Sequence, residues 1–199
     1  GSGLDLRKDQ KLGQGAGGMV FRARITRRSG ATEECAAKLL AAGAQQRELQ
    51  KFAKEFEIQR RASQQCEGVC RVYGTVRYDG ALCIVMRRYQ QSLWDLLDSR
   101  VDPADATKRV PLPLPQALTI ALSVARALVG LHGVDIRMQD LKPSNLLLDD
   151  QGVPVVSDFG IAKIEGATFN SILSKAGGGG TSNFMAPELF EEENITNKV

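Results

Sequence analysis

The chain of 199 residues is 43% hydrophobic and 25% charged, proportions typical of a globular protein with one domain or one two-lobed domain. Its 26 basic and 23 acidic residues leave a net charge of +3, which gives no reason to expect a nucleic acid or a membrane surface as a partner. The four cysteines are irregularly spaced and too few for a disulfide-stapled secreted domain, and they lack the paired short spacings of a zinc site. We therefore expect reduced, mostly buried thiols and a cytoplasmic location.

The first half of the chain is predicted to form strands around one charged helix. Apolar residues alternate from Met19 to Ile25, which indicates a strand with one buried face. The pair Asp79-Gly80 is a strong hairpin turn signal between two β-rich runs. The expected elements are strands over residues 19–27 and 34–40, a helix over 46–62 and a hairpin over 71–89.

The second half is predicted to contain two helices, separated by a loop and followed by a hairpin. A short helix is expected over residues 92–100, a proline-rich loop over 101–115 and a hairpin over 145–160.

The most apolar stretch, residues 117–131, is predicted to be a buried helix. It contains Ser123 and Arg126 and is too short to span a bilayer, so no membrane insertion is expected. Its large apolar residues recur at steps of four, four and three, which places them on one helical face, and Gly133 is the expected stop. The residues of this face are Ile120, Val124, Leu128 and Leu131.

Three glycines near the N-terminus suggest a phosphate-binding turn. Gly13, Gly15 and Gly18 form the pattern G-x-G-x-x-G, and Val20 follows them. Glycines let backbone amides approach phosphate oxygens because no side chain intervenes. Dinucleotide-binding folds use the same pattern but require a helix directly after it. Here an alternating strand follows, which favours a hairpin and disfavours a nicotinamide enzyme.

A strand lysine and a helix glutamate form the next pair of candidates. Ala36 and Lys38 are two residues apart in an expected strand, so their side chains point to the same face. A small side chain and an ammonium would suit a purine ring and its phosphates, although a lone strand lysine is usually a solvated edge charge. Glu55 and Glu57 are the rival partners of Lys38. Because two phenylalanines flank Glu55 on its own side, Glu55 is expected to face the core.

Two acidic motifs follow in the second half. Asp140 begins "DLKPSN", which ends at Asn145, and Asp158 begins "DFG" at the end of an expected strand. An aspartate before Phe-Gly in this position can hold a metal ion, and the glycine lets the chain swing. The motif "APE" at residues 186–188 closes the segment rich in Gly, Ser and Thr that comes next.

The ordered set of motifs resembles that of eukaryotic protein kinases over essentially the whole chain. The resemblance implies an α+β, protein-kinase-like two-lobed fold. A small antiparallel-sheet N-lobe with the hinge would occupy residues 1–89, and a partial helical C-lobe would occupy residues 90–199. The family continues past the APE motif into further helices, so the sequence is expected to be part of a larger kinase that carries regulatory domains.

The resemblance also implies ATP and Mg²⁺ as cofactors and assigns roles. The glycines would cover the phosphates of ATP, and Lys38 would hold the α and β phosphates with Glu55 as its partner. Asp140 would accept the proton of the substrate hydroxyl, while Asn145 and Asp158 would bind magnesium. The adenine would be sandwiched by Val20, Ala36 and Leu147, with Met86 at the gatekeeper position and the backbone of Arg87 and Tyr89 at its edge.

The substrate class can be inferred from the same loop. Lys142, two residues after Asp140, resembles the pattern of serine/threonine kinases, and Thr181 matches the threonine that braces both residues in that class. The implied substrates are Ser/Thr hydroxyls of proteins. The surrounding sequence is similar to the tyrosine-kinase-like branch, including plant and algal members.

Three departures from the family pattern bear on activity. Met138 and Gln139 stand where His-Arg usually precedes the catalytic Asp, and neutral Gln139 cannot pair with a phosphorylated activation loop as a guanidinium does. Gln59, four residues after Glu55, replaces an apolar residue, which weighs against tight helix closure. A silent pseudokinase acting as an interaction module is therefore the alternative, although it would typically lack one of four residues that are all retained. These four are Lys38, Asp140, Asn145 and Asp158.

Overall fold

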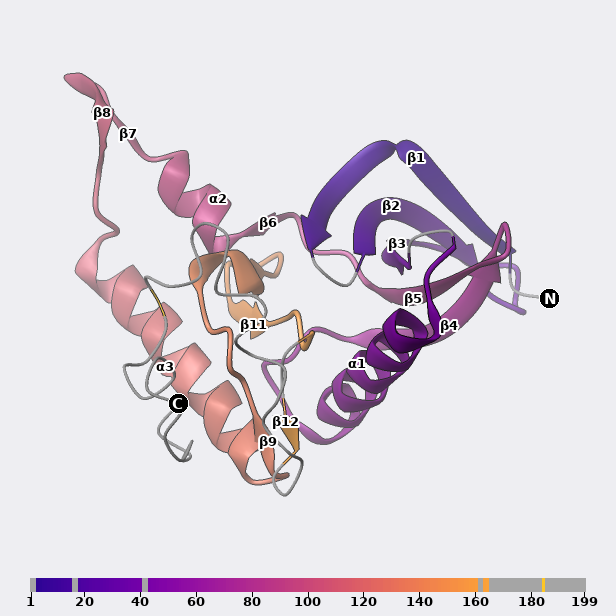
Figure 1. Ribbon diagram of the computed structural model, residues 1–199. Helices are drawn as coiled ribbons and strands as arrows, with labels where there is room; N and C mark the ends of the chain where they lie inside the picture. Colours follow the sequence, from indigo (N-terminus) through magenta and orange to yellow (C-terminus); the bar gives the residue numbers. More distant parts are fainter. Residues whose placement is uncertain (1–2, 16–17, 41–42, 161–162, 165–183, 185–199) are drawn as a thin grey trace. The chain divides into compact units, whose positions relative to one another are not determined.

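The computed structural model describes residues 3–15, 18–40, 43–160, 163–164 and 184. The chain divides into two compact units, and Figure 1 traces their elements along the sequence. The first unit comprises Gly1–Gln64 and Cys70–Arg88, and the second comprises Gln65–Val69 and Tyr89–Val199.

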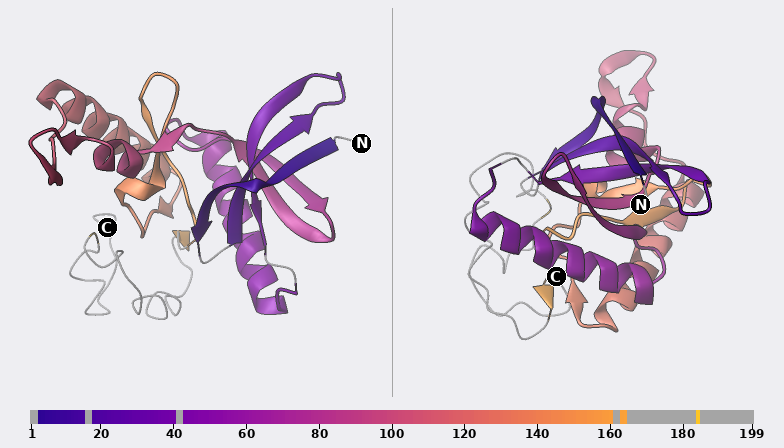
Figure 2. Two further views of the ribbon diagram at one scale, coloured as in Figure 1. Left: turned by 90° about the horizontal axis from the view of Figure 1, so that it is seen from above. Right: turned by 90° about the vertical axis from the view of Figure 1, so that its right-hand side faces the viewer.

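The first unit contains a five-stranded antiparallel sheet and a single described helix. The strands follow the order β1-β2-β3-β5-β4, and helix α1 runs along one face of the sheet (Figure 2). The predicted strands and helix are therefore confirmed. The elements are β1 (Gly3–Gly15), β2 (Gly18–Thr26), β3 (Thr32–Leu39), α1 (Gln46–Gln65), β4 (Val72–Tyr78) and β5 (Ala81–Arg87).

The alternating side chains of β2 contribute to a hydrophobic core of this unit. Phe21 and Ala23 are 7% and 1% exposed, whereas Met19, which shares their face, is 37% exposed at the start of the strand. Strand β1 alternates only at its start, where Leu4 and Leu6 face the same core, and its register with β2 is interrupted on both sides of Lys11. The other buried members of this core are Leu6, Cys35, Ala37 and Val85.

The hairpin of β4 and β5 turns where the sequence predicts. Asp79 and Gly80 have φ angles of 50° and 77° between the paired residues Tyr78 and Ala81. A two-residue turn with positive φ at both central positions matches the twist of the flanking strands. The prediction of a turn at residues 79–80 is confirmed.

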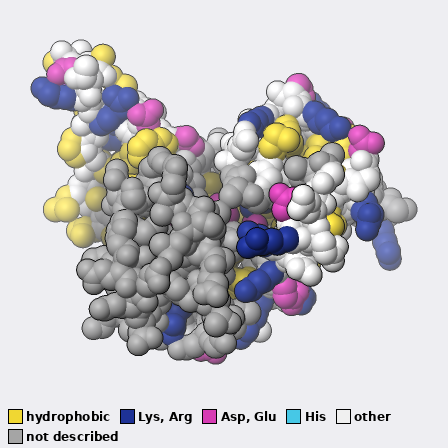
Figure 3. All heavy atoms as spheres, viewed as in Figure 1, with side chains coloured by type: hydrophobic (Ala, Val, Ile, Leu, Met, Phe, Trp, Pro, Cys, Tyr) yellow, Lys and Arg dark blue, Asp and Glu magenta, His cyan; other side chains and the backbone are white. Residues whose placement is uncertain are grey.

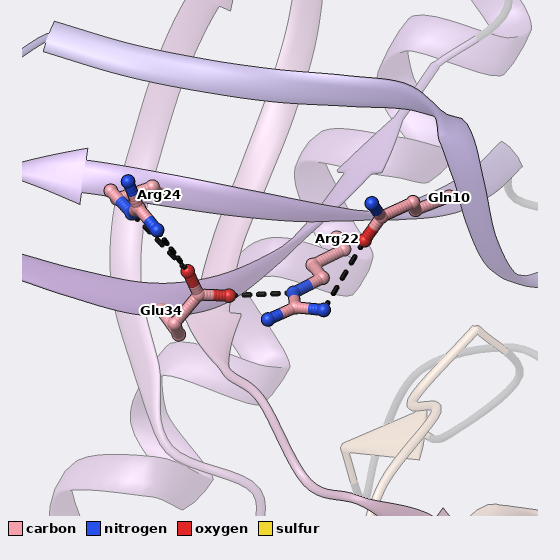
Figure 4. Close-up of polar contacts among 4 residues, drawn as sticks. All are labelled: Gln10, Arg22, Arg24 and Glu34. Atoms are coloured by element: carbon pink, nitrogen blue, oxygen red, sulfur yellow. Dashed lines mark hydrogen bonds and ion pairs between the residues drawn. The ribbon is translucent and has the colours of Figure 1, made fainter.

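A polar network at the surface joins the first three strands (Figure 4). Glu34 of β3 accepts hydrogen bonds from Arg22 Nε at 2.6 Å and Arg24 Nη2 at 2.9 Å, and Gln10 accepts one from Arg22 Nη1 at 3.3 Å. These bonds, that of Arg22 first and then that of Arg24, lower the pKa of Glu34. Exposed ion pairs add little stability, so the network mainly favours this register of the strands.

The second unit combines short strands with two helices in its described part. Strands β10 and β11 form the predicted hairpin, with Leu146 paired to Val156, and β6 extends that sheet. The predicted short helix is α2, whose first turn is closed by reciprocal bonds between Ser92 and Asp95, a capping box. The elements are β6 (Gln91–Ser92), α2 (Leu93–Asp98), β7 (Val101–Asp102), β8 (Asp105–Arg109), α3 (Leu114–His132), β9 (Ile136–Arg137), the 3₁₀ turn η1 (Pro143–Asn145), β10 (Leu146–Leu148), β11 (Pro154–Val156) and β12 (Lys163–Ile164).

The prediction of a loop over residues 101–115 is wrong for its first part, where β7 and β8 form a small hairpin. Asp102 accepts a hydrogen bond from the Ala104 N–H at 2.8 Å, which turns the chain. Arg100 closes the base by donating to the carbonyls of Val110 and Pro111. Because polar side chains rather than alternating apolar residues hold this hairpin, apolar periodicity could not indicate it.

Helix α3 is buried on one face only. Ile120 and Leu131 are 7% and 0% exposed, which confirms the buried face at these two positions, whereas Val124 and Leu128 of the predicted face are only half-buried. The helix ends at His132, with Gly133 as its C-cap, as expected. The rest of the helix exposes large apolar side chains, and Figure 3 shows yellow side chains at the left, where the first part of α3 lies in Figure 1. These are Leu114, Leu118, Leu122 and Val129, exposed by 52% to 73%.

The structure corrects the premise that the apolar stretch is too short to span a bilayer, because α3 extends over Leu114–His132, beyond the predicted residues 117–131. By length and composition alone, α3 could cross a membrane, and within the described residues it is the one such helix. A core helix of a soluble protein satisfies the same criterion, so the feature is weak evidence for a membrane span.

The segment Gln65–Val69, which connects α1 with β4, belongs to the second unit. Gly68 has a φ of 69°, and a Cβ atom there would lie 2.8 Å from the Cβ of Ala127 in α3. Its carbonyl accepts a hydrogen bond from the Val156 N–H at 2.8 Å, and Val69 bridges Val156 in parallel. Glycine is therefore required by both the backbone conformation and the close approach of α3.

Candidate active site

The glycine turn joins β1 to β2, with Gly13 paired to Val20 and Gly15 paired to Gly18. Gly18 has a φ of 135°, and a Cβ there would lie 2.0 Å from the carbonyl oxygen of Leu39. At Gly13, by contrast, no described atom lies within 4 Å of the position of a Cβ. The fold itself requires the glycine at position 18, whereas the glycine at position 13 keeps space open beside the backbone.

Leu12 precedes the first glycine and was not singled out from the sequence. This residue of β1 is 47% exposed. An apolar residue directly before a glycine turn is the signal that could have identified it as a candidate contact for a nucleotide base.

Strands β2, β3 and β5 bring four of the predicted nucleotide-binding residues onto one face. Val20 pairs with Lys38, and Ala36 pairs with Met86. Directly paired residues project to the same side of a sheet, and so do residues two apart in one strand. Ala36 and Met86 are 6% and 8% exposed. The face therefore has a small apolar surface next to a single ammonium group.

The ion pair expected between Lys38 and Glu55 is present. Lys38 Nζ donates to Glu55 Oε1, and the two side chains are 8% and 5% exposed. The rival Glu57 has a side chain that is 60% exposed and pairs with Arg60 at 2.9 Å. Removing two charges from water is costly, so a buried pair of this kind is stable only with close contact. The contact fixes α1 against β3 and holds the ammonium at the sheet.

The two predicted hinge residues, Arg87 and Tyr89, belong to different units. The N–H of Arg87 donates to the carbonyl of Arg71 at 2.8 Å, so only its carbonyl group could meet a nucleotide base. Tyr89 is half-buried and is assigned to the second unit. Their contacts with adenine remain predictions.

In the second unit, Asp140, Lys142 and Asn145 form one hydrogen-bonded turn. Lys142 Nζ contacts Asp140 Oδ2 at 2.7 Å, and Asn145 Nδ2 donates to the same oxygen at 3.1 Å and to the Asp140 carbonyl at 2.8 Å. Pro143 starts the 3₁₀ turn that brings Asn145 back toward Asp140. Because both donors meet Oδ2, the Asp140 carboxylate is held in one orientation, and Oδ1 is the oxygen for a further donor.

Asp158 stands directly after the hairpin of β10 and β11. It is exposed, with a φ of 58°, and its Oδ1 accepts a hydrogen bond from the Gly160 N–H at 3.2 Å. The next residue, Phe159, is 1% exposed and anchors the chain in the core. Leu147 of β10, predicted to contact adenine, is half-buried and pairs with Val155.

The oxygens of Asn145 and Asp158 suit a hard divalent cation. The Asn145 amide nitrogen is engaged with Asp140, so its carbonyl oxygen is the side-chain group that can ligate. In the described part of the chain, no three His, Cys, Asp or Glu residues cluster as metal ligands. Magnesium commonly uses one or two protein side chains and completes its shell with substrate phosphates and water, so this donor set fits it.

The two residues that replace His-Arg before Asp140 are both buried. Met138 and Gln139 are 3% and 6% exposed. Oε1 of Gln139 has no hydrogen-bond partner among the described residues. A neutral glutamine can occupy this place without a counter-ion, which a buried arginine would require. Gln59 of α1, the third departure, is likewise buried, with 2% of its surface exposed.

All four cysteines are thiols, as predicted, and three of them are buried. Burial raises the pKa of Cys35 to about 11 and that of Cys70 to about 12. These thiols are structural parts of the interior rather than nucleophiles. Thr181 and the APE motif, also named from the sequence, lie outside the described residues.

The buried pair of Lys38 and Glu55, together with the polar residues around Asp140, is the set of side chains expected in a nucleotide-dependent phosphotransferase. Residues 6–199 match the protein kinase domain, and the chain therefore belongs to the protein kinase family, whose enzymes phosphorylate proteins with ATP and a divalent metal.

Named relatives place the domain among kinases of serine/threonine type. The chain is 39% identical over 110 residues to E3 ubiquitin-protein ligase KEG of Arabidopsis thaliana, covering 55% of the chain and 6% of that protein. It is 32% identical over 199 residues to a probable LRR receptor-like serine/threonine-protein kinase of the same plant, covering 98% and 18%. Against mitogen-activated protein kinase kinase 1c of Physcomitrium patens it is 26% identical over 189 residues, covering 94% and 50%. The chain thus spans between 6% and half of the length of these relatives.

Proposed function

We propose that the whole protein is an active kinase that transfers the γ-phosphoryl group of ATP to Ser/Thr hydroxyls of proteins, with Mg²⁺ as its metal. The observation that carries this proposal is the retention of both polar groups with ordered internal contacts. One is the buried pair of Lys38 and Glu55, and the other is the turn that orients Asp140. Burying or ordering charged side chains costs free energy, and catalysis explains why these charged groups are retained despite that cost.

The first unit supplies nucleotide binding. Lys38 holds the α and β phosphates, and Glu55 keeps its ammonium in place against the sheet. The glycine turn covers the phosphates with backbone amides, and Gly13 provides the open approach that this requires. The remaining contacts with adenine come from Val20, Ala36, Met86 and the backbone of Arg87.

The second unit supplies the acceptor side of the reaction. Asp140 accepts the proton of the substrate hydroxyl, and Lys142, which contacts it, is the cation of this turn. Asn145 and Asp158 hold Mg²⁺, which neutralises charge on the phosphates when it is bound. Leu147 and the backbone of Tyr89 contact the adenine.

The relatives also support a proposal about the wider setting of the domain. Their length supports regulatory domains in the parent protein, and the receptor-like and plant names support the tyrosine-kinase-like branch. A cytoplasmic position of the kinase domain agrees with its four thiols. Protein substrates with Ser/Thr acceptors are the corresponding partners.

A pseudokinase that binds ATP and acts as an interaction module is the second candidate. It is favoured by Gln59 and Gln139, two buried amides at positions where the family has other side chains. In that case nucleotide binding persists and phosphoryl transfer is absent.

The deciding experiment measures transfer of the ATP γ-phosphate to a generic Ser/Thr substrate by the full-length protein and its Asp140→Asn variant. General-base catalysis contributes about a hundredfold or more, so transfer should fall by at least that factor while ATP binding is unchanged. Asp135→Asn is the matched control, because Asp135 is exposed and its φ of 59° is one that asparagine tolerates. Equal turnover of Asp140→Asn and wild type would exclude the catalytic assignment. ATP binding without transfer by the wild type would support the pseudokinase.

A further inference from the structure

Ser157, the residue before Asp158, makes two hydrogen bonds to one backbone carbonyl. Its N–H donates to the carbonyl of Asn145 at 2.8 Å, and its Oγ–H donates to the same carbonyl at 3.0 Å. The residue is 7% exposed, so both bonds are shielded from water. A carbonyl oxygen has two lone pairs and can accept both donors.

The two bonds differ in what they require of the sequence. Leu146 pairs with Val156 in the ladder of β10 and β11, so the Asn145–Ser157 contact extends that ladder by one pair. Any residue other than proline could supply the backbone bond. The hydroxyl bond needs a serine or threonine, and it adds to a contact that the strand pairing already provides.

Both ends of this contact lead directly to the proposed metal ligands. Asn145 is itself one, and its amide nitrogen is engaged with Asp140 at 2.8 and 3.1 Å. Asp158 is the other, and it follows Ser157 without an intervening residue.

The chain leaves the ladder immediately after Ser157. Asp158 adopts a φ of 58°, a conformation that is strained for most non-glycine residues, although aspartate tolerates it better than most. Its carboxylate then accepts a bond from Gly160 at 3.2 Å. Ser157 is thus the last residue held by the ladder before the backbone turns at Asp158, the metal-ligand candidate.

We propose that the Ser157 hydroxyl is a positioning group for the metal site: it fixes the carbonyl of Asn145 to the residue preceding Asp158 and so sets the spacing of the two oxygen ligands. The inference rests on the proposed function, because it takes Asn145 and Asp158 as the ligands. Groups that orient metal ligands in this way typically affect metal affinity by about ten- to a hundredfold.

The test measures Mn²⁺ binding by electron paramagnetic resonance, with a non-hydrolysable ATP analogue and the full-length protein. Ser157→Ala should weaken Mn²⁺ affinity about tenfold, while metal-free nucleotide binding stays as in the wild type and the metal-free unfolding temperature falls by only a few degrees, the cost of one buried hydrogen bond. Ser157→Thr and Ser157→Val form a matched pair of equal shape that differ in the hydroxyl, and the threonine variant should bind Mn²⁺ more tightly. Ser123→Ala is the control, since its Oγ donates to the Thr119 carbonyl at 2.9 Å on the exposed part of α3.

The outcomes separate the inference from the function on which it rests. Asp158→Asn should lose Mn²⁺ affinity if the metal site is correctly assigned. If Asp158→Asn weakens binding but Ser157→Ala does not, or if the threonine and valine variants bind equally, the positioning role is overturned and the metal site stands. If Asp158→Asn binds Mn²⁺ normally, the metal assignment itself is overturned. A Ser157→Ala variant that fails to fold without metal also counts against the proposal, since that result indicates a purely structural bond.

Discussion

Removal of the Glu55 carboxylate should destabilise the protein strongly. The side chains of Lys38 and Glu55 are 8% and 5% exposed, so Glu55→Ala leaves a buried ammonium without its carboxylate. Breaking a buried pair from one side costs about 3–5 kcal/mol, which is a large share of the roughly 5–15 kcal/mol that stabilises a typical domain. Urea unfolding followed by circular dichroism at neutral pH measures the change in unfolding free energy.

Two comparisons make this test specific. Glu57→Ala changes the same residue type two positions away, where the side chain is 60% exposed and pairs with Arg60, and it should cost about 1 kcal/mol or less. The double variant Lys38→Met with Glu55→Leu replaces both charges by apolar groups of similar size and should recover most of the stability. Glu55→Ala costing no more than Glu57→Ala would refute the reasoning, and so would a double variant as unstable as the single one.

Three further predictions concern the glycines, the thiols and the altered motif. Gly18→Ala should lower the unfolding temperature markedly because the added Cβ meets the Leu39 carbonyl, whereas Gly13→Ala should fold normally and weaken ATP binding. Thermal unfolding and nucleotide titration measure the two effects, and the reverse pattern would contradict the assignment of the glycine turn to phosphate binding. At pH 8, iodoacetamide should modify half-buried Cys66 before Cys70, because burial raises the pKa of the Cys70 thiol from a reference of 9 to about 12; mass spectrometry showing Cys70 modified first would be inconsistent with its burial. The stability gained by burying the neutral Cys70 thiol is complete below pH 9 and declines as the pH rises from 9 toward 12. Because Gln139 is neutral and buried, phosphatase treatment of the loop-phosphorylated full-length kinase should change turnover only a few-fold; a loss of a hundredfold or more, about 3 kcal/mol in transition-state terms, would show a charge-driven switch.

Elements with a strong local signal were predictable from the sequence. The alternation in β2, the turn at Asp79-Gly80 and the charged helix α1 all depend on residues that are neighbours along the chain. The choice of Glu55 over Glu57 was also predictable, because flanking phenylalanines define the buried face of α1.

Elements defined by distant contacts were not predictable. Strands β6, β9 and β12 are two residues long, too short for any periodicity, and exist because other segments pair with them. The β7–β8 hairpin is held by polar side chains that also occur in ordinary loops. Within the candidate site, the role of Ser157 depends on its register against Asn145, which no pattern of residue types reveals.

The close approach of Gly68 to Ala127 has a consequence for how such a gene can be recombined. The chain passes between the units at residues 64–65, 69–70 and 88–89, so the first unit is not one uninterrupted coding segment. A chimera joined at residue 89 would pair the 65–69 loop of one parent with the α3 of another, and any side chain at position 68 would have its Cβ only 2.8 Å from a Cβ placed as that of Ala127. Chimeras should therefore survive when positions 68 and 127 come from the same parent, and the smallest exchangeable block at this boundary consists of two separated stretches of sequence.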